Sequence, residues 1–405
     1  MRRGYKRWLA QIFVIFCCVW LASTVQGYSF DMVVPDVREP ASLSGGSACP
    51  VAAHQLTTPG YIDLRWSTML DTDPVTIITQ DQTAGGQLNE IEAVITQSLS
   101  AWTGVSGTVL APAAFAALAR TSTQNACGAD GINSVCFDQM DLAFTPGVLA
   151  FARIVTADRA GIVLGNETAS SEPGQIIDAD VYFDPDDANV TFATPQALPA
   201  NPKSYDLESL MIHELGHLLG FSHTAVWSAM MFPYAPAPGT YTGQRPSAPR
   251  PDAPLSDDDR TGLRVLYTDL TDTAHAGSIS GRIVPASPLS LPANPPGVTG
   301  VFGAQVVAVN AATGAVMAAT LGGWSCAAPG PALFDGSYTI ARLPVGVSYT
   351  VYAEPLNGVV APSQVIPALD DLCRNSTTDP GWPPSQACIV PQPNLGFTVR
   401  TLPGP

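Results

Sequence analysis

Residues 213–223 read HELGHLLGFSH, and this stretch sets three histidines at a spacing that suits one metal ion. Residues four apart lie on the same face of an α-helix, so His213 and His217 present their rings to a single point. Gly220 lets the helix stop in a left-handed turn, because glycine adopts that conformation without a steric penalty. The chain then brings His223 back toward the same point. The pattern predicts a metal site built from three imidazoles.

The chemistry of such a site follows from its open coordination position. Three neutral imidazoles leave one position free on a tetrahedral Zn²⁺, where water loses a proton near neutral pH. Glu214 lies about 100° around the helix from His213, which favours a general base over a fourth ligand. The bare HExxH pattern arises by chance in about one chain in a hundred, and the added Gly and His make coincidence much rarer. His54 and His275 lie in linker-like sequence and are expected to be solvated.

Sequence on both sides of the motif matches a known family. SAMMFPYAP, from Ser228, puts Met231 eight residues after His223 and resembles the Met-turn of the metzincins. LSDDDRTGLRVLY, residues 255–267, resembles the closing helix of the matrixin subfamily, and YDLESLMIHELGHLLG resembles its active-site helix. Asp206 or Ser204 is expected to cap that helix. Its apolar side is expected to bury Leu207, Leu210, Met211 and Leu218.

The resemblance implies an α+β, matrixin-type catalytic domain over residues 61–267, with a twisted, mostly parallel sheet plus helices. YIDLRWS and PVTIIT predict a first strand with an interruption, and QLNEIEAVITQSLSAWTGVSG has helical spacing. GVLAFARIV and IIDADVYFDP predict the last strands before the catalytic helix. By analogy with the family, Leu149 and Ala150 form the upper rim of a substrate cleft, and Pro233 and Tyr234 form the lower rim.

This chain also departs from the animal matrix metalloproteinases. Where those carry histidines for a second, structural zinc, Phe151 and Tyr182 stand here, so we expect one catalytic Zn²⁺ only. Two alternatives stay open for the carboxylates Asp178, Asp180 and Asp184: a Ca²⁺ site, since carboxylates are hard oxygen ligands, or an acidic strand end beside a loop.

The N-terminus has the pattern of a signal peptide. MRRGYKRW carries four positive charges ahead of a short apolar run, so residues 1–27 are expected to direct secretion to an extracellular or periplasmic location. An uncleaved anchor is the alternative. Residues 28–60 form an N-terminal extension, in which Cys49 is either half of a disulfide or a thiolate switch on the zinc.

Six cysteines follow the leader, and an even number in an oxidising compartment suggests disulfides. Plausible pairs are Cys127 with Cys136, Cys373 with Cys388, and Cys49 with Cys326. The formal net charge is −16 with 13% charged residues, which excludes a basic nucleic-acid footprint. It also disfavours an anionic membrane as partner. We expect a monomer that acts on protein or peptide substrates.

The periodicity changes after residues 268–276, a small polar stretch expected to be a linker. GSISGRIV, GAQVVAVNAATGAVMAATL, GSYTIARL and VSYTVYAEPL alternate apolar and polar positions, with Thr313-Gly314 as a hairpin turn. Residues 277–356 resemble the carboxypeptidase regulatory-like fold, a small transthyretin-like β-sandwich. Residues 357–405 are a Pro-rich extension with two cysteines. The β-sandwich is either a stabilising appendage or a module that binds a substrate or surface. The insertion at residues 235–254, in the catalytic domain, either forms a wall of the specificity pocket or is a solvated loop.

Together these patterns predict a secreted zinc-dependent endopeptidase in which Glu214 activates water. Two alternatives remain open. One is a non-enzymatic extracellular binding protein with a structural metal, although a structural zinc usually has four protein ligands and no fourth Cys or His stands near His223. The other is a hydrolase of a different amide.

Overall fold

The computed structural model describes residues 32–33, 62–63, 75–80, 88–110, 115–120, 128–129, 131, 133–137, 144, 147–157, 161–164, 175–183, 190–240, 254–285, 300–301, 303–322, 325–326, 332–333 and 336–356. Within these residues the helices are α1 (Leu88–Thr103), α2 (Leu207–Leu218), α3 (Asp257–Leu266) and a short 3-10 helix, Leu198–Ala200. The strands of the N-terminal two thirds are β1 (Met32–Val33), β2 (Ile62–Asp63), β3 (Val75–Gln80), β4 (Phe115–Arg120), β5 (Asn133–Cys136), β6 (Ala150–Thr156), β7 (Ile176–Phe183), β8 (Phe192–Ala193) and β9 (Tyr205–Asp206). Those that follow are β10 (Gly277–Arg282), β11 (Ala304–Asn310), β12 (Val316–Gly322), β13 (Ser325–Cys326), β14 (Ala332–Leu333), β15 (Ser337–Leu343) and β16 (Tyr349–Pro355).

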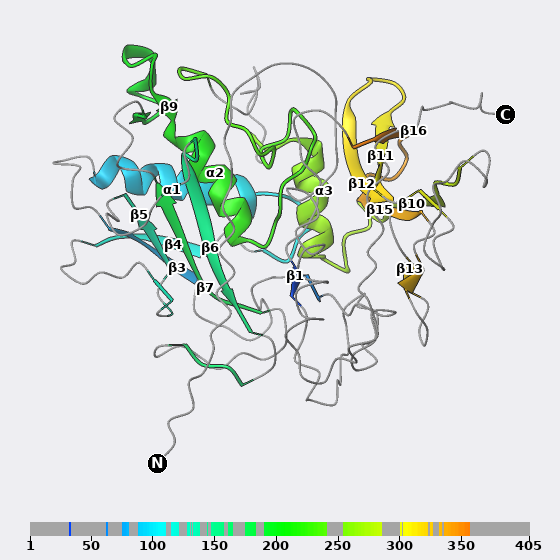
Figure 1. The fold of residues 1–405 in the computed structure, drawn as a ribbon, viewed down its shortest axis with the longest axis horizontal. Helices are drawn as coiled ribbons and strands as arrows, with labels where there is room; N and C mark the ends of the chain where they lie inside the picture. The colour runs from blue at the N-terminus through cyan, green and yellow to red at the C-terminus, as the bar shows by residue number, and fades with distance from the viewer. Residues whose placement is uncertain are drawn as a thin grey trace, which may run out of the picture.

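A five-stranded, mostly parallel sheet supports the N-terminal part, in the order β4-β3-β5-β7-β6 (Figure 1). The pairs β3–β4, β3–β5 and β5–β7 are parallel, whereas β6 runs antiparallel to β7 at the edge. This agrees with the sheet predicted from the sequence. The prediction of one interrupted first strand was wrong, because β2 pairs with β1 in a separate two-stranded sheet and only β3 enters the large one.

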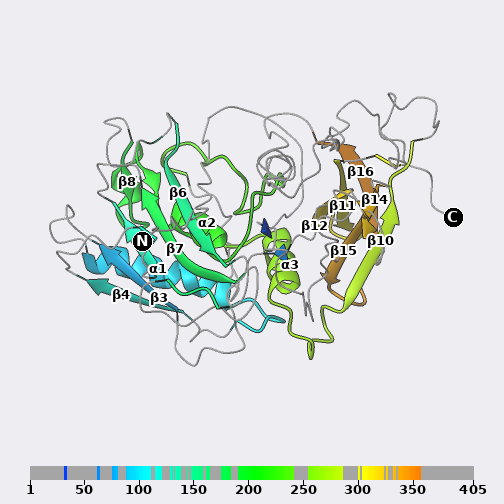
Figure 2. The same cartoon turned by 60° about the horizontal axis from the view of Figure 1, so that its bottom comes forward.

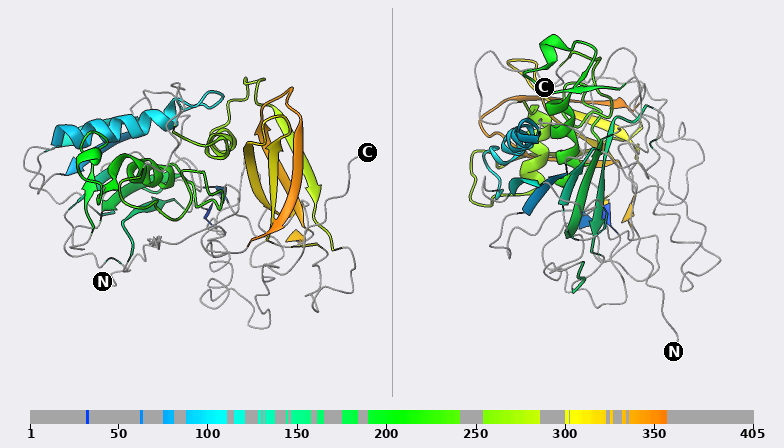
Figure 3. Two further views of the ribbon diagram at one scale, coloured as in Figure 1. Left: turned by 90° about the horizontal axis from the view of Figure 1, so that it is seen from above. Right: turned by 90° about the vertical axis from the view of Figure 1, so that its left-hand side faces the viewer.

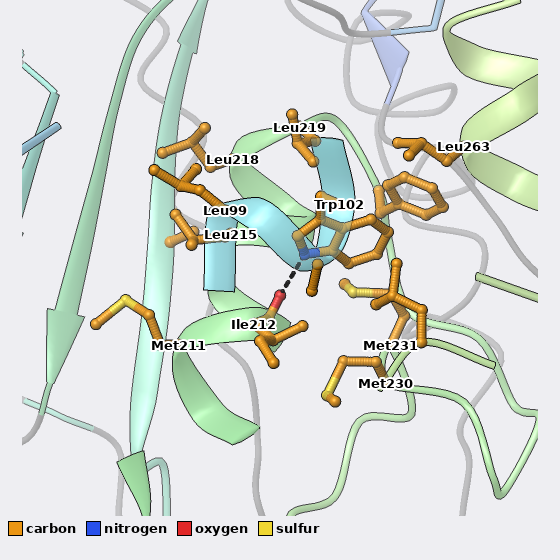
Figure 4. Close-up of a cluster of buried hydrophobic side chains, with 14 of the residues drawn as sticks. Leu99, Trp102, Met211, Ile212, Leu215, Leu218, Leu219, Met230, Met231 and Leu263 are labelled. Atoms are coloured by element: carbon orange, nitrogen blue, oxygen red, sulfur yellow. Dashed lines mark hydrogen bonds between the residues drawn. The ribbon is translucent and has the colours of Figure 1, made fainter. Parts of the chain in front are cut away.

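Helices α1 and α2 lie against the sheet and against each other. The expected apolar positions of α1 are buried, with Trp102 fully so. Its indole Nε1 donates a hydrogen bond of 2.9 Å to the carbonyl of Ile212 on α2 (Figure 4). The predicted apolar side of α2 is buried as well: Leu207, Leu210, Met211 and Leu218. This packing holds the helix with the two histidines rigidly over the sheet.

Strands β8 and β9 pair in a short parallel sheet of their own. The strands from β10 onward form a second group at one end of the molecule (Figure 2). Strands β12, β11 and β16 make an antiparallel sheet, and β10 pairs with β15. We call residues 277–356 the C-terminal β unit. The predicted hairpin turn is present, because Gly314 has a φ of 72° and its N–H donates to the carbonyl of Asn310 at 2.8 Å.

Helix α3 lies between the two parts, as the view from above shows (Figure 3, left). One apolar cluster runs through it: Leu263 and Leu266 of α3 join the core around α2 to buried residues of the β unit, including Val306, Ala318 and Ile340. The stretch 268–276 is tied to both sides, since the N–H of Val345 donates to the carbonyl of Ala274 at 2.9 Å. His275 belongs to no group of metal ligands among the described residues, as expected, but its side chain is only 17% exposed and its Nδ1 lies 2.7 Å from a carboxylate oxygen of Asp272.

Candidate metal centre and cleft

Local sequence sets the start and the end of α2 around the histidines. Asp206 is the N-cap, and its carboxylate accepts a hydrogen bond of 3.0 Å from the N–H of Ser209. The helix ends at Leu218, and Gly220 takes a left-handed φ of 102°. The sequence predicted the turn at Gly220 and offered Asp206 or Ser204 as the cap, because both features depend on residues within one turn of the helix ends; the structure has Asp206. The reversal at Gly220 carries the chain back to His223.

The three histidines converge as the spacing predicted. His213 Nδ1 lies 2.7 Å from the carbonyl of Met230, and His217 Nδ1 lies 2.7 Å from the carbonyl of Phe221. Each Nδ1 must therefore carry the proton and donate it, which leaves the Nε2 atoms as bare acceptors. Those two Nε2 atoms are 3.2 Å apart. A ligand nitrogen of His223 joins them, because one nitrogen from each of the three rings lies within 4.8 Å of the others.

This arrangement fits Zn²⁺. Two acceptor nitrogens facing each other in a buried site repel unless a cation lies between them. Nitrogens around a tetrahedral Zn²⁺ are about 3.3 Å apart, close to the separation found here. Burial lowers the pKa of His213 to about 4 and that of His217 to about 3. Both rings are therefore neutral at pH 7, which is the form that binds metal. Among the described residues, no other group of His, Cys, Asp or Glu has ligand spacing.

Glu214 lies in the same cavity as His213 but on a different side of α2. Its side chain is only 2% exposed, and burial raises the pKa of the carboxyl to about 8. The backbone N–H of Ala152 on β6 hydrogen bonds to the carboxylate and opposes that rise. The edge strand thus fixes the orientation of the carboxyl group. A carboxyl held in a site with this pKa suits proton transfer near neutral pH.

Met231 is buried beside Trp102 (Figure 4), and its sulfur lies against Gly216 of α2. The turn that contains Met231 is held by Asp259 of α3, whose carboxylate accepts hydrogen bonds of 2.8 Å and 3.2 Å from the N–H groups of Met230 and Met231. The Met230 carbonyl in turn orients His213. The sequence pattern predicted the turn but gave no reason for the aspartate, since the contact spans about thirty residues.

A narrow cleft lies beside His213 and Glu214. It is lined by all four residues proposed from the family resemblance: Leu149, Ala150, Pro233 and Tyr234. Their role in substrate binding stays a prediction. The sequence analysis did not identify five further lining residues, because apolar and small residues in a helix or turn indicate ordinary packing: Ser209, Leu210, Met230, Phe232 and Ala235. Ala235 is the first residue of the predicted insertion, and residues 241–253 of that insertion lie outside the described residues.

Beside the cleft stands an exposed aromatic side chain that the sequence analysis missed. Trp227 is 57% exposed, and its ring centroid lies 5.1 Å from that of Phe232. Phe232 in turn lies 5.7 Å from the ring of Tyr234. The three rings extend the apolar lining of the cleft outward. An isolated tryptophan between a histidine and a methionine carries no signal of this in the sequence.

Phe151 and Tyr182, which the sequence analysis compared with zinc-binding histidines of the animal enzymes, are packed among aromatic rings. Phe151 on β6 is the register partner of Tyr182 on β7, and their rings stack at 4.9 Å. Phe144 packs on the same pair, with ring centroids 5.1 Å from Phe151. The hydroxyl of Tyr182 donates to Asp180, and burial followed by this carboxylate raises the Tyr182 pKa. The side chains at these positions offer no zinc ligand of the kind found in the animal enzymes.

Two of the carboxylates considered for calcium, Asp178 and Asp180, accept hydrogen bonds from backbone N–H groups. Asp180 accepts hydrogen bonds of 2.8 Å and 3.0 Å from the N–H groups of Gly128 and Ser134, and Asp178 accepts one of 3.1 Å from Gly131. Both side chains are buried, at 1% or less exposed. These contacts favour the structural alternative for Asp178 and Asp180. Asp184 lies outside the described residues, so the calcium site itself stays untested.

Several sequence predictions fall outside the described residues. These are the signal peptide at 1–27, the C-terminal extension at 357–405, His54, and the cysteines at 49, 127, 373 and 388. Cys136 is buried and disulfide-bonded, but its pairing with Cys127 stays a prediction. Among the helices that the structure describes, none is long and apolar enough to span a bilayer.

Comparison with known proteins supports the family resemblance over part of the chain. Residues 150–268 match the model of the matrixin family, which is less than a third of the sequence. The chain is 33% identical over 103 residues to the interstitial collagenase of Sus scrofa, covering 25% of this chain and 18% of that protein. It is 33% identical over 110 residues to metalloendoproteinase 1 of Glycine max, covering 27% of this chain and 30% of that protein. The chain therefore matches less than a third of the length of these relatives.

Proposed function

We propose that this protein is a secreted, zinc-dependent endopeptidase whose catalytic domain covers residues 61–267. The observation that carries the proposal is the pair of bare Nε2 atoms 3.2 Å apart beside a buried glutamate in a narrow cleft. The matrixin match over residues 150–268 supports the reaction class. Secretion rests on the signal-peptide pattern at the N-terminus alone.

His213, His217 and His223 would hold one Zn²⁺, with the protonated Nδ1 atoms of His213 and His217 kept in place by backbone carbonyls. When bound, the zinc supplies a Lewis acid that polarises a carbonyl and acidifies water. Glu214 takes a proton from the attacking water and returns it to the nitrogen of the leaving amine. Burial assists both steps, since a carboxyl with a raised pKa accepts and releases a proton near pH 7.

The substrate is proposed to be an extended peptide that pairs with the edge strand β6. An edge strand leaves a row of backbone N–H and C=O groups for pairing with another chain. Leu149 and Ala150 stand at the start of this strand and line the cleft opposite Pro233 and Tyr234. An apolar side chain of the substrate would enter between these two rims. Endopeptidase action follows from a cleft lined by an edge strand, which accommodates chain on both sides of the cleaved bond.

The test is digestion of casein and of a labelled peptide library by the full chain, with and without chelator. Glu214→Ala should keep one tightly bound zinc and a native unfolding transition, yet lose turnover by several orders of magnitude. Glu92→Ala is the matched control, because Glu92 lies on α1 away from the cleft. Full activity in Glu214→Ala, or activity that chelator leaves unchanged, would refute the proposal.

Metal analysis separates the finer points. We expect one zinc per chain, and two would contradict the interpretation of Phe151 and Tyr182 as packing residues. Calcium addition should leave the unfolding temperature unchanged if Asp178 and Asp180 only accept hydrogen bonds from the N–H groups of Gly128, Gly131 and Ser134. A protein that binds one zinc but cleaves neither casein nor peptides would instead favour the non-enzymatic binding protein.

A further inference from the structure

The edge of the C-terminal β unit that faces the catalytic domain is covered by side chains of α3. Strand β12 is the outer strand of the β12-β11-β16 sheet. The N–H of Ala319 donates to Asp258 Oδ1 at 2.8 Å, and Thr261 Oγ1 donates to the carbonyl of Met317 at 3.2 Å. Both α3 side chains are only 1% exposed. Backbone groups that a neighbouring strand would otherwise pair are thus satisfied by a helix.

The other oxygen of Asp258 faces the metal centre. Thr224 Oγ1 donates to Asp258 Oδ2 at 2.9 Å, and the N–H of Val226 donates to Thr224 Oγ1 at 3.3 Å. The N–H of Thr224 donates to the carbonyl of Met231 at 2.9 Å. Thr224 directly follows the third histidine in the chain. One buried carboxylate therefore bridges the β unit and the segment that carries His223.

Apolar packing reinforces the bridge. Val226 and Ala229, from the turn between His223 and Met231, form one buried cluster with Val307 and Ala319 of the β unit. All four side chains are 1% exposed or less. The face of the β11–β12 sheet thus packs against Val226 and Ala229, two residues of the segment 224–229. That segment has no regular secondary structure of its own, so its conformation depends on what it packs against.

We propose that Asp258 is a positioning residue for His223. Through Asp258, the C-terminal β unit is an integral part of the metal centre. The alternatives raised by the sequence were a stabilising appendage and a separate binding module. Neither requires a buried contact that reaches the residue next to a metal ligand. The proposal rests on the proposed zinc site but not on catalysis, so zinc affinity is the quantity that tests it.

The experiment measures the zinc dissociation constant of the full chain by chelator competition, together with its unfolding temperature. Partners of metal ligands typically change metal affinity by about 10–100-fold when they are removed. Asp258→Ala should weaken zinc binding by about that factor. Thr261→Ala is the matched control, because it removes a hydrogen bond across the same α3–β12 contact without touching the Thr224 segment. It should lower the unfolding temperature and leave zinc affinity within about twofold.

A second pair of variants tests the bridge from the other side and does not depend on Asp258→Ala folding. Thr224→Ala removes the hydroxyl and should weaken zinc binding, whereas Thr224→Ser keeps the hydroxyl and should restore it. Equal zinc affinity in the two Thr224 variants would overturn the proposal. Equal weakening in Asp258→Ala and Thr261→Ala would overturn it too, because the β unit would then act only through general stability. A wild-type chain that binds zinc but hydrolyses nothing would refute the proposed function and leave this inference standing.

Discussion

Substitution of Gly216, inside the HELGH motif, is predicted to destabilise the protein for a steric reason. A Cβ built at this position would lie 2.2 Å from the sulfur of Met231 and 2.8 Å from Cζ2 of Trp102. Both neighbours are buried, at 1% and 0% exposed (Figure 4). The close approach of α2 to the turn that contains Met231 therefore favours a residue without a side chain.

Two opposing terms decide the effect of Gly216→Ala. Alanine favours the helix over glycine by about 1 kcal/mol, whereas overpacking a buried site costs about 1–3 kcal/mol. Contacts this short in a core without free space put the cost at the upper end. We expect the free energy of unfolding to fall by about 1–2 kcal/mol. Displacement of Met231 would also shift the Met230 carbonyl that orients His213, so zinc affinity should fall as well.

A double-mutant cycle with Met231→Ala, measured by urea unfolding of the full chain, isolates the clash. Met231→Ala alone should cost about 2–5 kcal/mol, because it opens a cavity. In that background the new methyl group of Gly216→Ala enters the cavity, so the second change should be neutral or stabilising. The two effects should therefore fail to add by at least about 1 kcal/mol. Additive effects, or a stabilising Gly216→Ala in the wild-type chain, would refute the steric argument.

Three further predictions follow from buried polar contacts. Trp102→Phe should lower the unfolding free energy by about 1–3 kcal/mol, because the Ile212 carbonyl loses its buried donor. The zinc content should not change, and an unchanged urea midpoint would contradict the role given to this hydrogen bond. Asp259→Asn should lower the free energy of unfolding, measured in urea, by about 1–3 kcal/mol, because an amide NH₂ would face N–H donors of the Met-turn. A stability equal to that of the wild-type chain would show that the carboxylate does not hold the turn. In the metal-free protein, burial sets the pKa of His213 and His217 below the ordinary value of 6.5, so the unfolded state binds more protons and stability is lost as pH falls below 6.5. The unfolding free energy should then drop by up to about 1.4 kcal/mol per pH unit for each imidazole, with a shallower slope in His217→Ala; a flat profile between pH 6.5 and pH 5 would rule this out.

The features that the sequence predicted well join residues that are close together in the chain. The Asp206 cap, the left-handed Gly220 and the shared face of His213 and His217 are each set within one or two helical turns. The position of Met231 relative to His223 is also a local feature, because the eight residues of separation limit the distance between them. Such features follow from backbone geometry and need no knowledge of the rest of the fold.

The features that escaped prediction join residues far apart. The Trp102 hydrogen bond to Ile212 spans 110 positions, and the Asp258 contact with Ala319 spans 61. For the same reason, the sequence left Asp178 and Asp180 open as either a Ca²⁺ site or an acidic strand end. The N–H groups that donate to these carboxylates lie 46 or more residues earlier in the chain. A carboxylate in a sequence carries no mark of whether its partner is a cation or a loop.

The aspartate pair at the start of α3 shows what a family pattern leaves unexplained. Successive helical residues point about 100° apart, so Asp258 and Asp259 meet different neighbours although they are adjacent. Asp259 accepts from the Met-turn that orients His213, and Asp258 accepts from the segment that follows His223. Both residues are 1% exposed, and each carboxylate accepts hydrogen bonds from N–H and O–H groups. Removing either carboxylate leaves buried donors without an acceptor, so the pair is required by two separate parts of the same metal centre. An Asp-Asp pair at this position therefore indicates how the segments that carry or orient the metal-binding histidines are held. It indicates only indirectly which reaction the site catalyses.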